Sequence, residues 1–132
     1  MPEQRYASRS SHVLVGDLES FIYGAIAELS EGEDVLSAPF VLYHGPVNGE
    51  EDGPVEVCVP KAAGDKTLPA TQVAFTAIQG EQCRFPEILG AYEAVYRWVR
   101  EHGREPDGAA REVYLSGPGE GERLEIAVPL RA

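Results

Sequence analysis

The sequence predicts an α+β fold built from two copies of a strand–helix–strand–strand (βαββ) unit, with an antiparallel sheet and two helices. The first observation is a repeated hairpin pattern. Phe40-Val-Leu-Tyr-His44, a Gly-rich loop and Glu56-Val-Cys-Val-Pro60 recur as Arg111-Glu-Val-Tyr-Leu115, a second Gly-rich loop and Glu125-Ile-Ala-Val-Pro129. The second observation is that one extended segment and one helix-patterned segment precede each hairpin. The duplication therefore covers most of the chain.

This duplication predicts one domain, residues 1–132, with internal repeats at about 4–60 and 70–130. A chain of this length is large enough to bury a hydrophobic core without disulfides or metals. Two related halves create a pseudo-twofold cleft lined from both sides. Such a cleft is a common place for a protein to bind a small molecule.

The first unit is expected to begin with an irregular strand over residues 6–15. Asp17 is then expected to cap a helix that ends near Gly32. Its apolar positions recur at three- and four-residue spacing, which is typical of one buried helix face: Leu18, Phe21, Ile22, Ala25, Ile26 and Leu29. Strands over 40–43 and 55–59 close the unit, and residues 60–69 form a linker that turns at Gly64-Asp65.

The second unit is expected to begin with a strand over residues 71–78. Pro86 near its first turn and Gly103 after its basic last turn delimit the second helix. Its apolar stripe consists of Ile88, Leu89, Tyr92, Val95, Tyr96 and Val99. Strands over 111–115 and 124–130 form the closing hairpin, whose turn is expected at Gly117-Pro-Gly-Glu-Gly121.

Side chains alternate between the two faces of a strand, so the strand sequences also predict the faces of the sheet. We assign Val113, Leu115, Ile126 and Val128 to the face that meets the helices. The opposite face then carries Glu112, Tyr114, Glu125 and Ala127, and the same reasoning in the first unit gives Val41, Tyr43, Glu56 and Cys58.

Carboxylates and tyrosines on apolar strands suit a planar, partly apolar cation. If Glu112 and Glu125 are cross-strand neighbours, burial and mutual repulsion should raise the pKa of at least one of them.

The charge of the chain limits its partners. The formal net charge is −11, and no cluster of Lys or Arg is present. Direct binding to nucleic acid is therefore not expected, whereas the acidic field favours a positively charged ligand. No apolar run is long enough to span a bilayer or to act as a signal peptide, so we expect a cytoplasmic protein that does not bind membranes.

Cysteine and histidine provide no sign of a metal site or cofactor. Cys58 and Cys83 are too few for a disulfide framework, and we expect reduced thiols. His12, His44 and His102 lack the spacing of metal ligands. The sequence therefore predicts no metal and no cofactor.

Several of these segments, taken in order, are similar to a known family. Pro39-Phe-Val-Leu-Tyr-His-Gly-Pro-Val47 with Asp52-Gly-Pro-Val-Glu-Val-Cys-Val-Pro60 resembles the effector-binding domain of MerR-type multidrug-responsive transcription regulators. Ala91-Tyr-Glu-Ala-Val-Tyr-Arg-Trp-Val-Arg-Glu-His-Gly103, with the strands that begin at Arg111 and Leu124, resembles the second half of the same domain. It is known as the GyrI-like, or gyrase-inhibitory-protein-like, small-molecule-binding domain. The resemblance covers nearly the whole chain.

This resemblance implies a site as well as a fold. In family members that bind cationic drugs, an acidic residue in the cleft pairs with the positive charge and aromatic rings enclose the drug. The matching acids here are Glu112, in the Glu-Val-Tyr motif, and Glu125, and the candidate rings are Tyr114, Tyr43 and Phe75. No helix-turn-helix or coiled-coil linker precedes the domain in this sequence. We therefore expect a stand-alone binding domain without a DNA-binding part, or a domain cut from a longer protein, and no regulator activity from this chain without a separate protein partner.

The expected function is small-molecule binding, in a sensor or sequestering role for hydrophobic cationic or planar drug-like compounds. The predicted ligand-binding residues are Glu112, Glu125, Tyr114, Tyr43, Phe75, Val41, Glu56 and Ala127. An alternative implied by the family is a hydrolase of electrophilic cyclopropane-bearing compounds, in which Glu112 or Glu125 acts as general base on water. A third reading is a protein-interaction module similar to the gyrase-inhibitory proteins.

Overall fold

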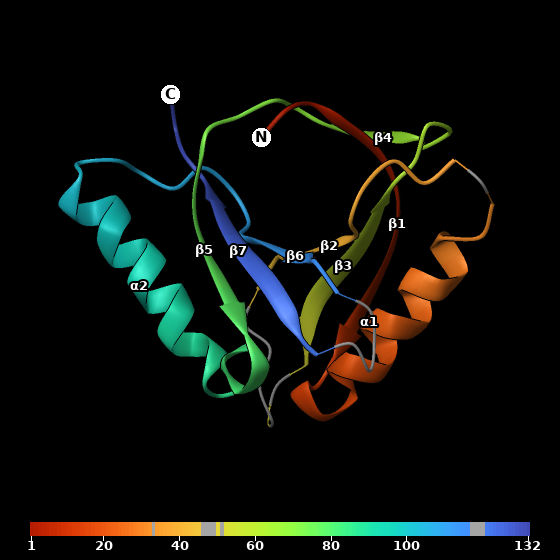
Figure 1. Cartoon of the computed structure of the whole chain (residues 1–132), viewed down its shortest axis with the longest axis horizontal. Helices are drawn as coiled ribbons and strands as arrows, with labels where there is room; N and C mark the ends of the chain where they lie inside the picture. The colour runs from red at the N-terminus through yellow and green to blue at the C-terminus, as the bar shows by residue number, and fades with distance from the viewer. Residues whose placement is uncertain (33, 46–49, 51, 117–120) are drawn as a thin grey trace. The chain divides into compact units, whose positions relative to one another are not determined.

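The computed structural model describes residues 1–32, 34–45, 50, 52–116 and 121–132. It divides into two compact units, residues 2–70 (the first unit) and residues 71–132 together with Met1 (the second unit). Within the described residues the chain forms seven β-strands, two α-helices and one short 3-10 helix (Figure 1). The predicted α+β class with two helices and antiparallel strand pairing is confirmed. Each unit is described by itself below.

In its described residues the first unit forms four strands and one helix, in the order β1 (Gln4–Val13), α1 (Val15–Leu29), β2 (Phe40–Tyr43), β3 (Gly53–Pro60) and β4 (Lys66–Leu68). Its strands lie in the spatial order β4-β1-β3-β2, and each neighbouring pair is antiparallel. Both predicted strands of the hairpin are present. The strand β4 lies inside the segment that we expected to be only a linker.

The start of α1 differs from the prediction. The N-cap residue is Leu14, and no side chain caps this end of the helix. Asp17 lies in the first turn, where its charge is favourable next to the helix N-terminus although it is not the cap. Gly32 has a φ of 105°, a left-handed conformation that suits glycine just after a helix end.

The described part of the second unit forms three strands, one α-helix and the 3-10 helix. Their order is β5 (Val73–Gln79), the 3-10 helix (Gly80–Cys83), α2 (Ile88–Glu101), β6 (Arg111–Tyr114) and β7 (Arg123–Pro129). The strands lie in the order β6-β7-β5, again antiparallel. The sequence did not predict the 3-10 helix. Of the expected turn at 117–121, residues 117–120 lie outside the described residues.

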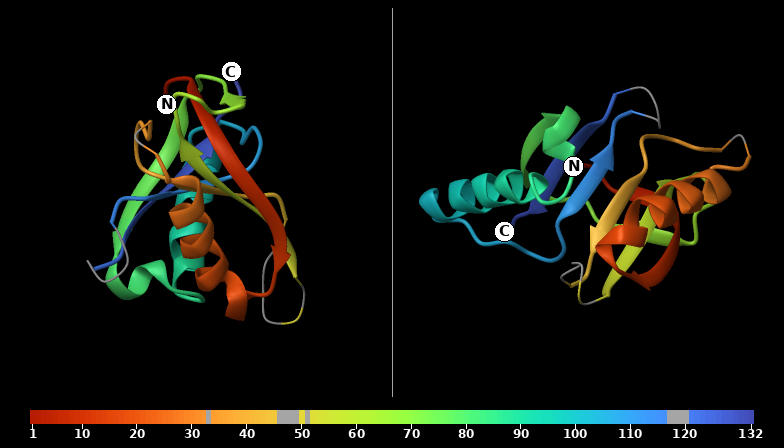
Figure 2. Two further views of the ribbon diagram at one scale, coloured as in Figure 1. Left: turned by 90° about the vertical axis from the view of Figure 1, so that its right-hand side faces the viewer. Right: turned by 90° about the horizontal axis from the view of Figure 1, so that it is seen from below.

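The core of the second unit lies between α2 and one face of β5 and β7. Figures 1 and 2 show α2 lying along these strands. One cluster joins helix residues Val95 and Val99 to Ala74, Val128 and others, and a second joins Ile88 to residues of the same strands. The predicted apolar stripe therefore faces the sheet, except for Leu89, which is 52% exposed. Neither helix has the length and apolar character needed to cross a membrane, within the described part of the chain.

Candidate functional site

The two faces of the first-unit sheet are distinguished by strand register. Glu56 lies opposite Leu42 on β2, and Cys58 lies opposite Ser8 on β1 and Phe40 on β2. Residues directly opposite in an antiparallel pair project from the same face. These side chains therefore share one face, which also carries Tyr6, the residue two positions before Ser8 on β1.

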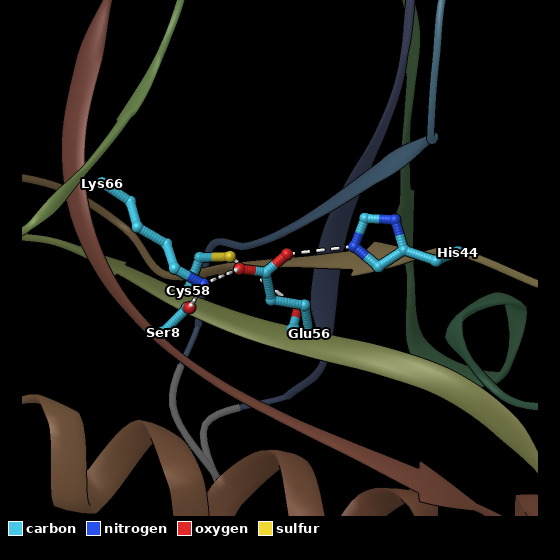
Figure 3. A network of polar contacts seen from close by, with 5 residues as sticks. All are labelled: Ser8, His44, Glu56, Cys58 and Lys66. Atoms are coloured by element: carbon cyan, nitrogen blue, oxygen red, sulfur yellow. Dashed lines mark hydrogen bonds and ion pairs between the residues drawn. The ribbon is translucent and has the colours of Figure 1, made fainter.

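The helix α1 packs on the other face. Arg9 lies opposite Val57, and its guanidinium forms an ion pair with Glu28 of α1. Figure 3 shows α1 on one side of β3 and the side chain of Glu56 on the other. We call the face that carries Tyr6, Ser8, Phe40, Leu42, Glu56 and Cys58 the α1-free face.

The carboxylate of Glu56 is the centre of a polar network on this face (Figure 3). Lys66 Nζ donates to Glu56 Oε2 at 3.1 Å and to Ser8 Oγ at 2.7 Å. His44 Nε2 lies 3.0 Å from Glu56 Oε1. Glu56 itself is only 8% exposed, so its charge is held among partners and away from solvent.

The surroundings of Glu56 and Lys66 favour their charged forms. Burial raises the pKa of Glu56, but hydrogen bonds from Ser8, His44 and Lys66, with the charge of Lys66, outweigh burial and lower the pKa overall. The pKa of Lys66 is raised, chiefly by its hydrogen bond to Glu56. Glu56 is thus an ionised carboxylate that already holds an internal cation, supplied by β4.

Next to this network, two rings and a thiol make the face partly apolar. The rings of Tyr6 and Phe40 meet edge-to-face, with centroids 5.6 Å apart. Cys58 is fully buried, and its Sγ lies 3.8 Å from the carbonyl oxygen of Glu56. A thiol without solvent access is a poor nucleophile, so we assign Cys58 a packing role.

In the second unit the corresponding face carries a different set of residues. Glu125 lies opposite Val113 and Ala77, and Ala127 lies opposite Arg111 and Phe75. Their neighbours on β7, Leu124, Ile126 and Val128, belong to the clusters that pack with α2. We call the opposite face, with Phe75, Ala77, Arg111, Val113, Glu125 and Ala127, the α2-free face.

Glu125 differs from Glu56 although both stand at the same position of the repeat. Its side chain is half-buried, and within the described part of the chain no hydrogen bond or ion pair joins its carboxylate to another residue. Val113 and Ala77, directly opposite on the flanking strands, are apolar. Phe75, on the same face, is 61% exposed. Among the described residues, Glu125 is thus a carboxylate without an ion-pair partner, on a face that also carries an accessible aromatic ring.

The face predicted for Glu112 and Tyr114 is wrong. Glu112 lies opposite Ile126 and Tyr114 lies opposite Leu124, so both project toward α2. Glu112 is 4% exposed and accepts a hydrogen bond from Tyr92 Oη, on α2. Burial and the charge of Glu112 raise the pKa of Tyr92, which keeps the phenol protonated as the donor.

It follows that Glu112 and Glu125 are not cross-strand neighbours. They project from opposite faces, so the expected pair of repelling carboxylates does not form. The hydrolase alternative could use either one as base, but a site made of both is contradicted by the register.

The face predicted for Val41 and Tyr43 is also wrong. They lie opposite Val57 and Val55, on the side of the sheet that α1 covers, and Val41 is fully buried. Of the predicted ligand residues, the helix-free faces carry Glu56, Phe75, Glu125 and Ala127. The helix-packed faces carry Val41, Tyr43, Glu112 and Tyr114.

Sequence reasoning missed three residues of the Glu56 network: Ser8, His44 and Lys66. The two-residue spacing between Tyr6 and Ser8 indicates that both side chains lie on the same face of a strand. Only the register of β1 with β3 shows that this face also carries Glu56. Lys66 lies in β4, and nothing in its sequence neighbourhood pointed to Glu56. No group of His, Cys, Asp and Glu among the described residues could hold a metal ion.

The chain is similar to known proteins in its fold. No family model and no curated protein matches the chain. Among solved structures, a crystal structure of the EcmrR C-terminal domain superposes with a TM-score of 0.76 at 21% identity, over 99% of this chain and 93% of that one. EcmrR in a cryo-EM structure of an EcmrR–DNA complex superposes with a TM-score of 0.82 at 20% identity. EcmrR belongs to the MerR family, and its C-terminal domain is GyrI-like.

The chain has a GyrI-like fold. The resemblance noted in the sequence is thereby confirmed at the level of the fold. The match covers 99% of this chain but only 55% of the EcmrR chain in the DNA complex. The fold similarity concerns the part of EcmrR that corresponds to its C-terminal domain.

Proposed function

We propose that this GyrI-like chain is a ligand-binding domain, in a sensor or sequestering role, for small hydrophobic or planar cations. The observation that carries the proposal is the half-buried Glu125 carboxylate, which has no ion-pair partner in the described part of the chain. The similarity to the C-terminal domain of EcmrR supports a ligand-binding role. The net charge of −11 supports a cation over an anion.

The surroundings of Glu125 explain why a cation that is also hydrophobic is favoured. A half-buried carboxylate flanked by Val113 and Ala77 has lost part of its hydration without gaining a partner from the residues that the structure describes. A ligand ammonium or delocalised cation supplies that partner. The exposed ring of Phe75 adds apolar contact, and a well-placed cation–π interaction is worth about 0.5–2 kcal/mol.

The contrast with Glu56 supports the same assignment. Glu56 already pairs with Lys66 and His44, so a ligand cation there must first displace an internal one. Glu125 needs no such displacement. We therefore assign Glu125 as the anchor, while a ligand-binding role for Glu112, Tyr114, Tyr43 or Val41 stays a prediction on which the proposal does not depend.

The test is a fluorescence titration with rhodamine 6G, a planar cationic dye, and an uncharged dye of similar size. We expect tighter binding of the cation and a loss of about tenfold or more in its affinity for Glu125→Gln, because a charged partner contributes about 1.5–3 kcal/mol. Glu19→Gln makes the same charge change at an exposed position of α1 and should bind like the wild type.

Three outcomes would contradict the proposal. They are equal affinity for charged and uncharged dyes, no binding of either dye, and equal weakening by Glu125→Gln and Glu19→Gln. The last would show that net charge, and not the Glu125 carboxylate, attracts the cation. Circular dichroism of each variant checks that the fold is retained.

A further inference from the structure

The two units differ at one edge of their sheets. In the first unit, β1 pairs with β3 on one side and with β4 on the other. In the second unit, the equivalent strand β5 pairs with β7 and ends the order of strands among the described residues. Among the described residues, the outer edge of Val73–Gln79 therefore lacks the neighbouring strand that β1 has, although Thr71, just before β5, exchanges backbone hydrogen bonds with Met1.

The backbone of β5 presents hydrogen-bonding groups at this edge. Leu130 N donates to Gln72 O, and Gly80 N donates to Glu122 O, both at 2.9 Å. In an antiparallel strand alternate residues bond to the same neighbour, so even-numbered residues of β5 bond to β7. The N–H and C=O groups of Val73, Phe75 and Ala77 therefore point toward the open edge.

This edge has none of the usual protection. Natural edge strands are commonly blunted by Lys, Pro, bulges or inward-pointing charges. The seven residues Val73–Gln79 include no charged residue and no proline. An uncharged, unpaired edge of this length is suited to accept another strand.

A groove of about 420 Å³ runs beside the same edge. It is lined by strand residues Val73, Ala74, Phe75 and Thr76 and by helix residues Ala94, Val95 and Trp98. Phe75 is 61% exposed, and Trp98, whose ring stacks on His102, is 45% exposed. Trp98 is thus available to be covered by a partner on the α2 side of the sheet, whereas Phe75 belongs to the α2-free face and meets the groove at the strand edge.

Charge points to the nature of that partner. The whole chain carries −11, which opposes association of two copies. The region around β5 is less acidic than the chain as a whole, because β5 is uncharged and the two acids of α2, Glu93 and Glu101, are balanced by Arg97 and Arg100; the segment between them adds Glu81, Arg84 and Glu87. A surface this close to balance does not select a strongly basic or acidic partner, and it opposes the approach of a second copy less than the rest of the chain does.

We propose that the β5 edges of two copies of this chain pair antiparallel about a twofold axis at Thr76, forming a homodimer. In this register Phe75 lies opposite Ala77 of the second copy, and the outward groups of both residues exchange hydrogen bonds. Residues directly opposite in an antiparallel pair project from the same face, so Thr76 of each copy projects toward its own α2. The two α2 helices therefore lie on the same face of the joined sheet.

The flank of α2 is self-complementary in this arrangement. Ala74 packs with Val95 and Val99, whereas Ile78 packs with Ile88, so α2 runs antiparallel to β5. Ala94 and Thr76 line the same groove, so the axis at Thr76 passes near Ala94. Trp98 lies four residues after Ala94 and Gly90 four residues before it. The exposed indole of one copy therefore meets Gly90 of the second, where a Cβ added to the glycine would find no heavy atom within 4 Å.

The first test is the mass of the full chain in solution, by size-exclusion chromatography with light scattering. We expect twice the chain mass of 14.3 kDa for the wild type. Thr76→Lys places two ammonium groups opposite each other at the axis and should give a monomer. Thr67→Lys makes the same change in β4 of the first unit and should remain dimeric.

The second test distinguishes pairing through the β5 edge from non-specific association. Ala77→Pro removes an outward N–H that β7 does not use, so it should give a folded monomer, whereas Ala77→Ser keeps the N–H and should remain dimeric. In a Cys83→Ser background, Thr76→Cys should form an intermolecular disulfide on mild oxidation, since Cα atoms of non-hydrogen-bonded pairs lie about 4.5 Å apart.

A monomeric wild type would overturn the proposal, and so would a dimer whose mass survives both Thr76→Lys and Ala77→Pro. If Thr76→Lys unfolds the chain, the disulfide decides, because Thr76→Cys is a small change. A dimer that does not cross-link through Thr76→Cys would contradict the proposed register and with it the proposal.

Discussion

Glu112 is a carboxylate that is 4% exposed and lies between a sheet and a helix. A buried charge is tolerated only when hydrogen bonds replace its lost hydration, and Tyr92 supplies one of them across the β6–α2 contact. The hydrogen bond thus joins Glu112 of β6 to α2 and helps to hold this helix against the sheet. Glu112 is therefore expected to matter for stability whatever its role in binding.

Removing the donor tests this role. We expect Tyr92→Phe to lower the free energy of unfolding by about 1.5–3 kcal/mol, the usual contribution of a hydrogen bond to a charged group. Tyr96→Phe makes the same change on α2 at a hydroxyl for which no partner is seen among the described residues, and should cost less than about 0.5 kcal/mol. Urea denaturation measures both. Equal effects of the two changes would contradict the structural role of the Tyr92–Glu112 bond.

The Glu56–Lys66 pair should make stability depend on pH in both directions. The pKa of Glu56 is below 4.5 in the folded protein, so its contribution is present above pH 4.5 and is lost as the pH falls through the folded pKa. The pKa of Lys66 is above 10.5, so its contribution is present below pH 10.5 and is lost as the pH rises through the folded pKa.

Lys66→Met should therefore cost about 0.5–1 kcal/mol near neutral pH, because the ammonium is partly exposed to solvent. The difference from the wild type should shrink below pH 4.5. Lys66→Arg keeps the charge and should retain most of the pH dependence. Thermal melts across the pH range measure this, and a difference that does not change with pH would show that the side chain acts by packing alone.

At these residues, alternation alone could not assign the faces. Residues Arg111–Val113 of β6 are all buried, so the strand has no contrast between a core face and a solvent face. Val113 appeared to be the core residue because it is apolar. The register with β7 and the phenol of Tyr92 reverse that assignment, and both are tertiary features that a four-residue strand does not encode by itself.

At the scale of elements, the stability of the first unit depends on a close contact between β1 and the segment that joins β3 to β4. A Cβ added to Gly64 would lie 2.5 Å from the carbonyl carbon of Tyr6, in the backbone of β1. Arg5 also donates to Gly64 O at 2.9 Å, which holds the two segments together. Only glycine permits this approach.

Gly64→Ala should therefore lower the free energy of unfolding by about 2 kcal/mol or more, because backbone atoms must move to admit the methyl group. Gly24→Ala is the matched control, since the added Cβ meets nothing within 4 Å on α1. A glycine replaced by alanine inside a helix should raise stability by about 0.5–1 kcal/mol. Chemical denaturation of both variants checks the opposite signs.

The elements themselves were largely predictable, because long periodic segments carry a strong signal. The apolar spacing from Ile88 to Val99 predicted α2, and the alternating segments at 40–43 and 124–130 predicted strands close to β2 and β7. β4 was not predictable, since three residues are too short for a pattern and its pairing with β1 is a tertiary contact. The prediction of Asp17 as the N-cap was wrong because the helix begins earlier, with Leu14 at the N-cap position.

For the whole molecule, the net charge of −11 should oppose folding at low ionic strength through self-repulsion. We expect the melting temperature to rise by a few degrees between about 20 mM and about 500 mM NaCl as salt screens this repulsion. The double variant Glu19→Gln/Glu81→Gln removes two exposed acids and should show a smaller rise. A salt response that is flat, or unchanged in the double variant, would contradict this expectation.

The three residues of β4 account for two differences between the units. They cover the edge of β1, and they bring the ammonium of Lys66 to Glu56. The described part of the second unit has neither a strand covering the edge of β5 nor an ion pair to Glu125. After an ancestral duplication, the presence or absence of one short segment would thus change both the availability of an edge and the availability of a carboxylate. In such a history the two copies could acquire separate tasks through a single insertion or deletion, without any substitution in the strands that carry Glu56 and Glu125.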